Sequence, residues 1–183
     1  MRLLLILTLM LTSVASASER LTQAAFATTY QQDGSTLQRK NQAVLDYLWV
    51  DVYAAAFYSA VELSPRQTLQ QQAGQRLELY YFRDIARSDV IKAAWLTLER
   101  QHAPAELQRL RTQVDALHAT FRDIRPGDRY ALNYSPRSGL SLERNGSTVF
   151  RSDNAELARA YLGIWLAPDG LSEQLRDELL REK

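Results

Sequence analysis

The segment between residues 128 and 151 constrains the fold of this chain most strongly, because turn residues divide it into short apolar stretches. Asn145-Gly146 separates two of these stretches, and this dipeptide favours the positive φ angles of a type I′ hairpin turn. Pro126-Gly127 marks a further turn where the segment begins. Strands joined by a tight hairpin run antiparallel. Residues 128–151 therefore predict a three-stranded antiparallel meander.

Three other segments have the composition of strands. Residues 47–61 are rich in β-branched and aromatic side chains, although three consecutive alanines in their middle also fit a helix. Residues 77–82 alternate in the manner of a half-buried strand. Residues 26–30 predict a shorter strand that ends before Asp33-Gly34. We expect these strands to join the meander in one sheet.

Four helices are predicted between and after the strands. Ser88 is a candidate cap for the first helix, and Pro104 suits the first turn of the second. The pair Asp153 and Glu156 has the spacing of a capping box before the third, and Ser172 is placed to begin the last. This order predicts an α+β chain with a mostly antiparallel sheet covered by helices.

Residues 1–17 have the composition of a cleavable signal peptide. A short positive start is followed by an apolar run over 3–14 and by Ala-Ser-Ala ahead of the polar Ser18. The run is shorter than the roughly 20 residues that span a bilayer, and an uncleaved anchor is the alternative. No later segment is apolar enough to cross a membrane. We expect one mature domain, residues 18–183, that is periplasmic or secreted.

Charge and motif content exclude several classes of function. Removing Arg2 from the 22 lysines and arginines leaves 21, which equals the 21 aspartates and glutamates, so no basic field attracts nucleic acid. The absence of cysteine excludes disulfides and thiolate metal sites. His102 and His118 have no metal-ligand spacing and are expected at the surface or the rim. Hydrolase and phosphate-loop motifs are missing, so we expect no metal and no cofactor.

Tyrosine is the one unusual chemical signal. The chain has nine tyrosines, and Tyr53 and Tyr81 stand on the two best predicted strands. A tyrosine with an apolar ring and a polar tip suits the wall of a ligand cleft, and it also suits a sheet core with hydroxyls at its rim. Arg83-Asp84 follows one of these strands and fits either the mouth of a pocket or, as we favour, a surface ion pair.

Four stretches together resemble the chalcone isomerase-like family, in its bacterial exported branch. They are residues 47–58, 77–95, 121–146 and 160–180, and their order covers nearly the whole chain after residue 17. The resemblance implies an open-faced β-sandwich, in which helices pack on one face of a large antiparallel sheet. It also implies a ligand cleft between the sheet and the helices.

The resemblance implies two kinds of activity. Plant enzymes of the family close a chalcone ring, whereas non-catalytic relatives hold a fatty acid through an arginine and a tyrosine. The enzymes' strand threonine corresponds to Tyr53, and their helix tyrosine and asparagine correspond to Arg87 and Ala94. An alanine cannot supply the hydrogen bond of an asparagine. The enzyme's set of residues is therefore not reproduced, and no catalytic residue is predicted.

We therefore expect an exported, non-enzymatic domain that binds a small amphipathic or fatty-acid-like ligand in a tyrosine-lined cleft. The family's arginine corresponds to a position near Asn41, beside Arg39 and Lys40. One of these two cations is expected to pair with a carboxylate, and Tyr53 and Tyr81 are expected to line the site.

Two alternatives belong to other classes. In the first, the chain is an isomerase or lyase on an unknown substrate, with Tyr53 or Tyr81 as proton donor. In the second, it is a structural or assembly module of the cell envelope without a ligand. The second alternative requires a sheet face filled completely by side chains such as Trp95 and Trp165, with no pocket.

Overall fold

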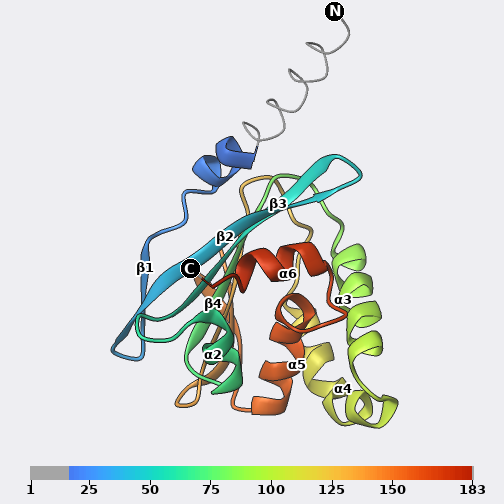
Figure 1. Cartoon of the computed structure of the whole chain (residues 1–183). Helices are drawn as coiled ribbons and strands as arrows, with labels where there is room; N and C mark the ends of the chain where they lie inside the picture. Colours follow the sequence, from blue (N-terminus) through green and yellow to red (C-terminus); the bar gives the residue numbers. More distant parts are fainter. Residues whose placement is uncertain (1–16, 183) are drawn as a thin grey trace, which may run out of the picture.

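The computed structural model describes residues 17–182, so the predicted signal peptide lies outside it except for Ala17. Within this range seven strands form one sheet, and each strand pairs antiparallel with its neighbour in the chain (Figure 1). The strands are β1 Thr29–Gln32, β2 Ser35–Tyr47, β3 Val50–Ala60, β4 Gln75–Tyr81, β5 Arg129–Ser135, β6 Gly139–Arg144 and β7 Ser147–Ser152.

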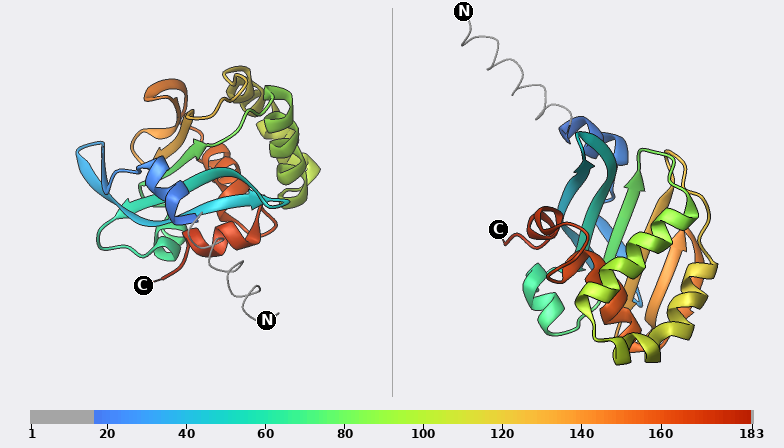
Figure 2. Two further views of the ribbon diagram at one scale, coloured as in Figure 1. Left: turned by 90° about the horizontal axis from the view of Figure 1, so that it is seen from above. Right: turned by 90° about the vertical axis from the view of Figure 1, so that its right-hand side faces the viewer.

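Helices cover one face of this sheet. Figure 2 shows α3, α4 and α5 in front of the strands, whereas the shorter α6 lies against β2. Residues 17–24 are also helical. The labelled helices are α2 Pro65–Gln70, α3 Arg87–Gln101, α4 Pro104–Ala119, α5 Ala155–Leu166 and α6 Glu173–Leu179. The α+β architecture with helices on one face of a large antiparallel sheet is confirmed.

The N-terminal strands differ from the prediction. The strand expected over 47–61 begins at Val50, because Leu48 and Trp49 form the turn of a β2–β3 hairpin. The strand expected over 26–30 is β1, which begins three residues later. No strand was predicted over β2, whose polar sequence lacks the β-branched and aromatic enrichment of β3. The meander over 128–151 is confirmed as β5, β6 and β7.

The helix ends show which capping predictions hold. Ser172 caps α6 as expected. The cap predicted at Ser88 is wrong, since the N-cap of α3 is Ala86, which has no side-chain bond. The backbone N–H of Arg87 donates instead to Asp123 Oδ1 at 2.9 Å, so a distant loop replaces the local cap. The capping pair predicted at Asp153 and Glu156 is also wrong, because the side chain that caps α5 is that of Asn154.

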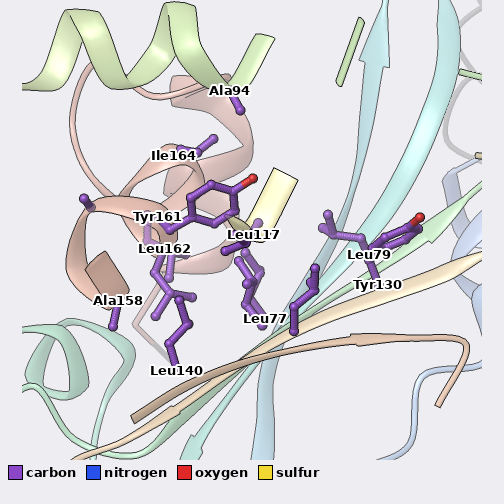
Figure 3. Close-up of a cluster of buried hydrophobic side chains, with 14 of the residues drawn as sticks. Leu77, Leu79, Ala94, Leu117, Tyr130, Leu140, Ala158, Tyr161, Leu162 and Ile164 are labelled. Atoms are coloured by element: carbon purple, nitrogen blue, oxygen red, sulfur yellow. The ribbon is translucent and has the colours of Figure 1, made fainter. Parts of the chain in front are cut away.

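The space between the sheet and the helices holds the main apolar core (Figure 3). Strand residues at alternate positions and helix residues at three- or four-residue spacing meet there. Complete burial of one such side chain contributes about 1.5–3 kcal/mol to the stability of the fold. The fully buried members of this core include Phe57, Leu77, Leu98, Leu110, Leu117, Leu140, Leu157 and Ile164.

The other face of the sheet carries a buried network of charged and amide groups. Arg76 donates to Glu143 at 2.8 Å, to Asn133 at 2.7 Å and to Glu78 at 3.2 Å. The Tyr30 ring lies over the Arg76 guanidinium at 4.0 Å, and its hydroxyl donates to Glu143 at 2.8 Å. Charges buried in this way are tolerated because each one is paired. A second, smaller apolar cluster covers the same face, where Ala24 and Phe26 of the N-terminal segment pack with Leu37, Ala54, Ala56 and Tyr58.

The β5–β6 turn supplies a test of this packing. Gly139 has φ +70°, and a Cβ there would collide with the Ser152 carbonyl and lie 2.8 Å from Asp153 Cα. We predict that Gly139→Ala lowers the free energy of unfolding by about 2–4 kcal/mol, from strain plus the collision.

The matched control is Gly146→Ala, because Gly146 has φ +80° and nothing within 4 Å of the added Cβ. Strain alone should lower its free energy of unfolding by about 1–2 kcal/mol. Chemical denaturation measures both variants. Equal losses would contradict the collision at Gly139.

Candidate functional site

A cavity of about 770 Å³ lies between the sheet and the helices. Strands β3, β4, β5 and β6 form one wall, and α3 and α5 form the other. The loops before α3, after α4 and before α6 surround its mouth. Its volume falls within the range of about 300–1,000 Å³ that holds small organic ligands. The sheet face is therefore not filled by side chains, which contradicts the premise of the structural-module alternative.

Strand register produces the apolar floor of the cavity. Leu77 of β4 pairs with Leu132 of β5, and Leu132 pairs with Leu142 of β6. Because side chains of directly paired residues point to the same side of a sheet, the three leucines form one row facing the helices. Toward the mouth a second row joins Tyr53 of β3 to Tyr81 of β4. The cavity thus changes from purely aliphatic to phenolic along its length.

The hydroxyl of Tyr53 is held by an indole. Trp165 of α5 donates its Nε1–H to the Tyr53 oxygen at 3.0 Å. An indole nitrogen only donates, so the phenol proton of Tyr53 stays available to a ligand. Within residues 17–182 the Tyr81 hydroxyl has no hydrogen-bond partner, although its ring packs 5.3 Å from that of Tyr53. Both phenols therefore offer hydrogen-bond donors to the cavity.

Burial keeps these phenols protonated. Desolvation raises the pKa of Tyr53 far above its usual value, and the Trp165 hydrogen bond only partly opposes it. Desolvation likewise raises the pKa of Tyr81, and the neighbouring phenols Tyr53 and Tyr130 raise it further. At neutral pH neither side chain carries charge. They suit a ligand with an oxygen acceptor and not one that needs a buried cation.

A third cavity hydroxyl is bonded to a buried histidine. Tyr161 of α5 lines the cavity, and its oxygen lies 3.0 Å from Nε2 of His118 on α4. Figure 3 shows the Tyr161 ring within the apolar cluster, its hydroxyl pointing away from Leu140. His118 is 3% exposed, so the surface or rim position predicted for it is wrong. Its spacing of four residues from Val114 was the available signal, since this spacing places both on one helix face.

All charged residues that line the cavity are exposed and lie at its mouth. Arg83 and Asp84 follow β4, and Arg122 follows α4; Asp46 and Asp89 complete the set. Arg83 Nε donates to the Asp51 carbonyl at 3.1 Å, and in the described chain no ion pair joins Arg83 to Asp84. The surface ion pair that the sequence favoured for Arg83-Asp84 is therefore wrong, and the dipeptide lies at the mouth of the cavity.

The four predicted ligand-binding residues are not brought together. Tyr53 and Tyr81 line the cavity, whereas Arg39 and Lys40 do not. The Arg39 guanidinium donates to the Phe26 carbonyl on the other face of the sheet, and Lys40 Nζ donates to the Val61 carbonyl at 2.9 Å.

A β-bulge accounts for the position of these two cations. The pairing of β2 with β3 shifts between Arg39 and Asn41, so Lys40 has no partner in the register. Asn41 donates its amide to the carbonyls of Leu179 and Arg181, at 2.9 and 2.7 Å, and so binds the C-terminal segment. The arginines near the cavity are instead Arg83 and Arg122, in loops where no periodic pattern signals their position.

Arg87 and Ala94, which correspond to the helix tyrosine and asparagine of the family's enzymes, differ in their relation to the cavity. Ala94 of α3 lines the cavity and offers no polar atom there. Arg87 at the start of α3 is exposed and donates to the His118 carbonyl at 3.0 Å. The cavity wall formed by α3 is therefore without a side-chain hydrogen-bond donor at these positions.

Between residues 17 and 182, no three histidine or acidic side chains are grouped so that they would hold a metal ion. None of the helices in that range combines the length and the hydropathy that crossing a bilayer requires.

Comparisons with known proteins address the fold. A family model described as chalcone isomerase-like matches residues 18–181. The crystal structure of a fatty-acid binding protein from Arabidopsis thaliana is similar, with a TM-score of 0.62 over 85% of this chain and 90% of that chain. The sequences are 13% identical, so this likeness shows the shared fold. No curated protein sequence matches the chain.

The buried His118 predicts a pH dependence of stability. Burial lowers the pKa of His118 to about 4, and Arg87 and Arg111 lower it against the opposing effect of Asp115. Between about pH 6.5 and pH 4, His118 is therefore protonated in the unfolded chain and neutral in the folded protein. The contribution of neutral His118 to stability is present in full above pH 6.5. The free energy of unfolding should fall by about 2–4 kcal/mol as the pH falls from 6.5 to 4.

Urea unfolding at pH 7, 5.5 and 4 measures the effect, with His118→Gln as the comparison. Glutamine keeps a hydrogen-bonding group toward Tyr161 and does not titrate. The variant should therefore lose less stability than the natural protein between pH 7 and 4. Identical losses in both proteins would show that His118 does not cause the dependence.

Proposed function

Because the chain belongs to the chalcone isomerase-like family, we propose that it is a non-catalytic protein that binds a small amphipathic, fatty-acid-like ligand. The cavity of about 770 Å³ between sheet and helices carries this proposal. Its floor is aliphatic, its middle presents phenol donors, and its mouth carries two arginines among three aspartates. The Arabidopsis thaliana protein of the same fold, which is a fatty-acid binding protein, supports the same class of ligand.

The distribution of charge indicates how such a ligand lies. Its apolar chain would contact the row of Leu77, Leu132 and Leu142. An isolated carboxylate is costly to bury, and none of the described residues that line the cavity is a buried cation that could pair with it. The carboxylate therefore belongs at the mouth, where water and the exposed Arg83 and Arg122 meet it. A neutral oxygen along the ligand would accept from Tyr53 or Tyr81.

The same phenols argue against proton-transfer chemistry. A general acid works best when its pKa lies near the working pH. Burial raises the pKa of both Tyr53 and Tyr81 far above neutrality. Their environment therefore favours hydrogen bonding to a ligand over donation of a proton to it. Chalcone cyclisation above background that disappears in Tyr53→Phe would contradict this reasoning.

A paired-ligand experiment tests the proposed orientation. We predict that Arg83→Gln/Arg122→Gln weakens binding of palmitic acid about tenfold, since two exposed charge pairs contribute roughly 1 kcal/mol or somewhat more together. Binding of hexadecanol, which has the same chain and no charge, should be unchanged. Isothermal titration calorimetry measures both ligands.

The control is Arg39→Gln/Lys40→Gln, which removes two cations that do not line the cavity. This variant should bind both ligands as the natural protein does. Failure of the natural protein to bind either ligand, together with empty protein in native mass spectrometry after purification from its own host, would overturn the proposed function. Loss of affinity in the control variant alone would overturn the orientation.

We also propose that the protein is exported to the periplasm or secreted. The composition of residues 1–17 and the start of the family match at residue 18 support this proposal. Expression of the full chain in a Gram-negative bacterium, followed by intact mass spectrometry of the periplasmic fraction, should give a protein that begins at Ser18.

A variant with a large residue at the cleavage site, Ala17→Leu, should accumulate at the full-length mass. Recovery of the unaltered chain from the cytosol at its full mass would contradict export.

A further inference from the structure

An exposed apolar tip ends the β2–β3 hairpin. Tyr47, Leu48 and Trp49 are 69%, 72% and 98% exposed, and they make up half of the six exposed large hydrophobic residues in the described chain. Figure 1 shows this hairpin reaching beyond the neighbouring strands of the sheet. Single exposed apolar residues are ordinary, but three consecutive ones at a projecting turn form a patch. We call residues 47–49 the hairpin tip.

The backbone at the hairpin tip is unusual for these residue types. Within residues 17–182, three hairpins have two-residue turns in which both φ angles are positive. Two of these turns are Asp33-Gly34 and Asn145-Gly146, the residues such turns favour. The third is Leu48-Trp49, with φ angles of +48° and +65°. Bulky side chains disfavour this conformation, so turn formation does not explain their presence.

The hairpin tip adjoins the mouth of the cavity and is held there. Tyr47 lines the cavity, and so does Leu171 across the mouth, which is 36% exposed. At the base of the hairpin, the Asp51 carboxylate forms an ion pair with Arg20 at 2.8 Å, and the Asp51 backbone carbonyl accepts a hydrogen bond from the Arg83 side-chain Nε at 3.1 Å. Exposed apolar side chains therefore stand directly beside the opening.

We propose that the hairpin tip inserts into the interfacial layer of a phospholipid bilayer and brings the cavity mouth to its surface. Tryptophan and tyrosine favour this layer because each has an apolar ring and a polar atom. Three large aromatic side chains at about 250 Å² each would bury roughly 750 Å², and the tip has less because one residue is a leucine and Tyr47 and Leu48 are only 69% and 72% exposed. The tip alone therefore falls short of the roughly 800 Å² per partner of a typical stable protein interface. A bilayer needs no such matching surface.

The charges near the tip define the kind of bilayer. Four aspartates lie near the tip and the cavity mouth beside three arginines, so the described residues form no basic cluster there that would attract anionic headgroups. The aspartates are Asp46, Asp51, Asp84 and Asp89, and the arginines are Arg20, Arg83 and Arg122. Insertion depends on the apolar side chains, and a zwitterionic phosphatidylcholine vesicle is the appropriate probe. Transfer of a ligand between bilayer and cavity rests on the proposed function, whereas docking itself does not.

Leu48→Asn/Trp49→Gly tests the docking, because it installs the favoured turn residues and removes the apolar tip. In flotation assays with phosphatidylcholine vesicles, the ligand-free natural protein should bind. The variant should bind at least tenfold more weakly, while its Tm stays the same or rises. The matched control Val61→Ser/Leu96→Ser removes two other exposed hydrophobic residues and should bind like the natural protein.

Two results would overturn the proposal: absence of vesicle binding by the natural protein, or equal binding by the tip variant. Self-association of the natural protein that the tip variant abolishes, without vesicle binding, would also overturn it and assign the tip to a second copy of this chain. Palmitic acid binding by the tip variant in the absence of vesicles reports on the cavity separately. Failure of docking and failure of the proposed function are therefore distinguishable.

Discussion

The register of β3, β4 and β5 decides which side chains of the sheet face the helices. It pairs Tyr53 with Tyr81 and Leu77 with Leu132, so apolar and phenolic rows face the helices. On the opposite face it gathers Arg76 and its charged partners into one network. A shift of one residue in β4 would exchange these faces, burying Arg76 beneath the helices and turning its leucines outward. The charged network and the cavity therefore stabilise the same register from opposite sides.

Helix α5 converts this sheet into a lined cavity. Tyr161 and Trp165 are four residues apart and so lie on one face of the helix, above the strands. Trp165 donates to Tyr53, while Tyr161 is bonded to His118 of α4. These two hydrogen bonds satisfy polar atoms that would otherwise be costly to bury. They link α5 to the sheet and to α4 without filling the space between the sheet and the helices. The cavity of about 770 Å³ is therefore kept open.

Local signals in the sequence were sufficient for the meander and for several helix starts, since the turn at Asn145-Gly146 and the cap at Ser172 act on adjacent residues. Tyr81 could be proposed as a lining residue because residues 77–82 alternate as a strand, and Tyr53 because it corresponds to the strand threonine of the family's enzymes. The position of Arg39 could not be predicted, because one bulged residue in β2 changes which side chains face the cavity. The mouth arginine Arg122 was missed because its position depends on the packing of a loop.

We propose that the cavity holds a fatty-acid-like ligand with its chain on the leucine row and its head at the mouth. A crystal structure of the protein with palmitic acid tests this arrangement. We expect the alkyl chain against Leu77 and Leu132, with the carboxylate within hydrogen-bonding distance of Arg83 or Arg122. A carboxylate buried beside Tyr161, or an empty cavity at saturating palmitic acid, would contradict it.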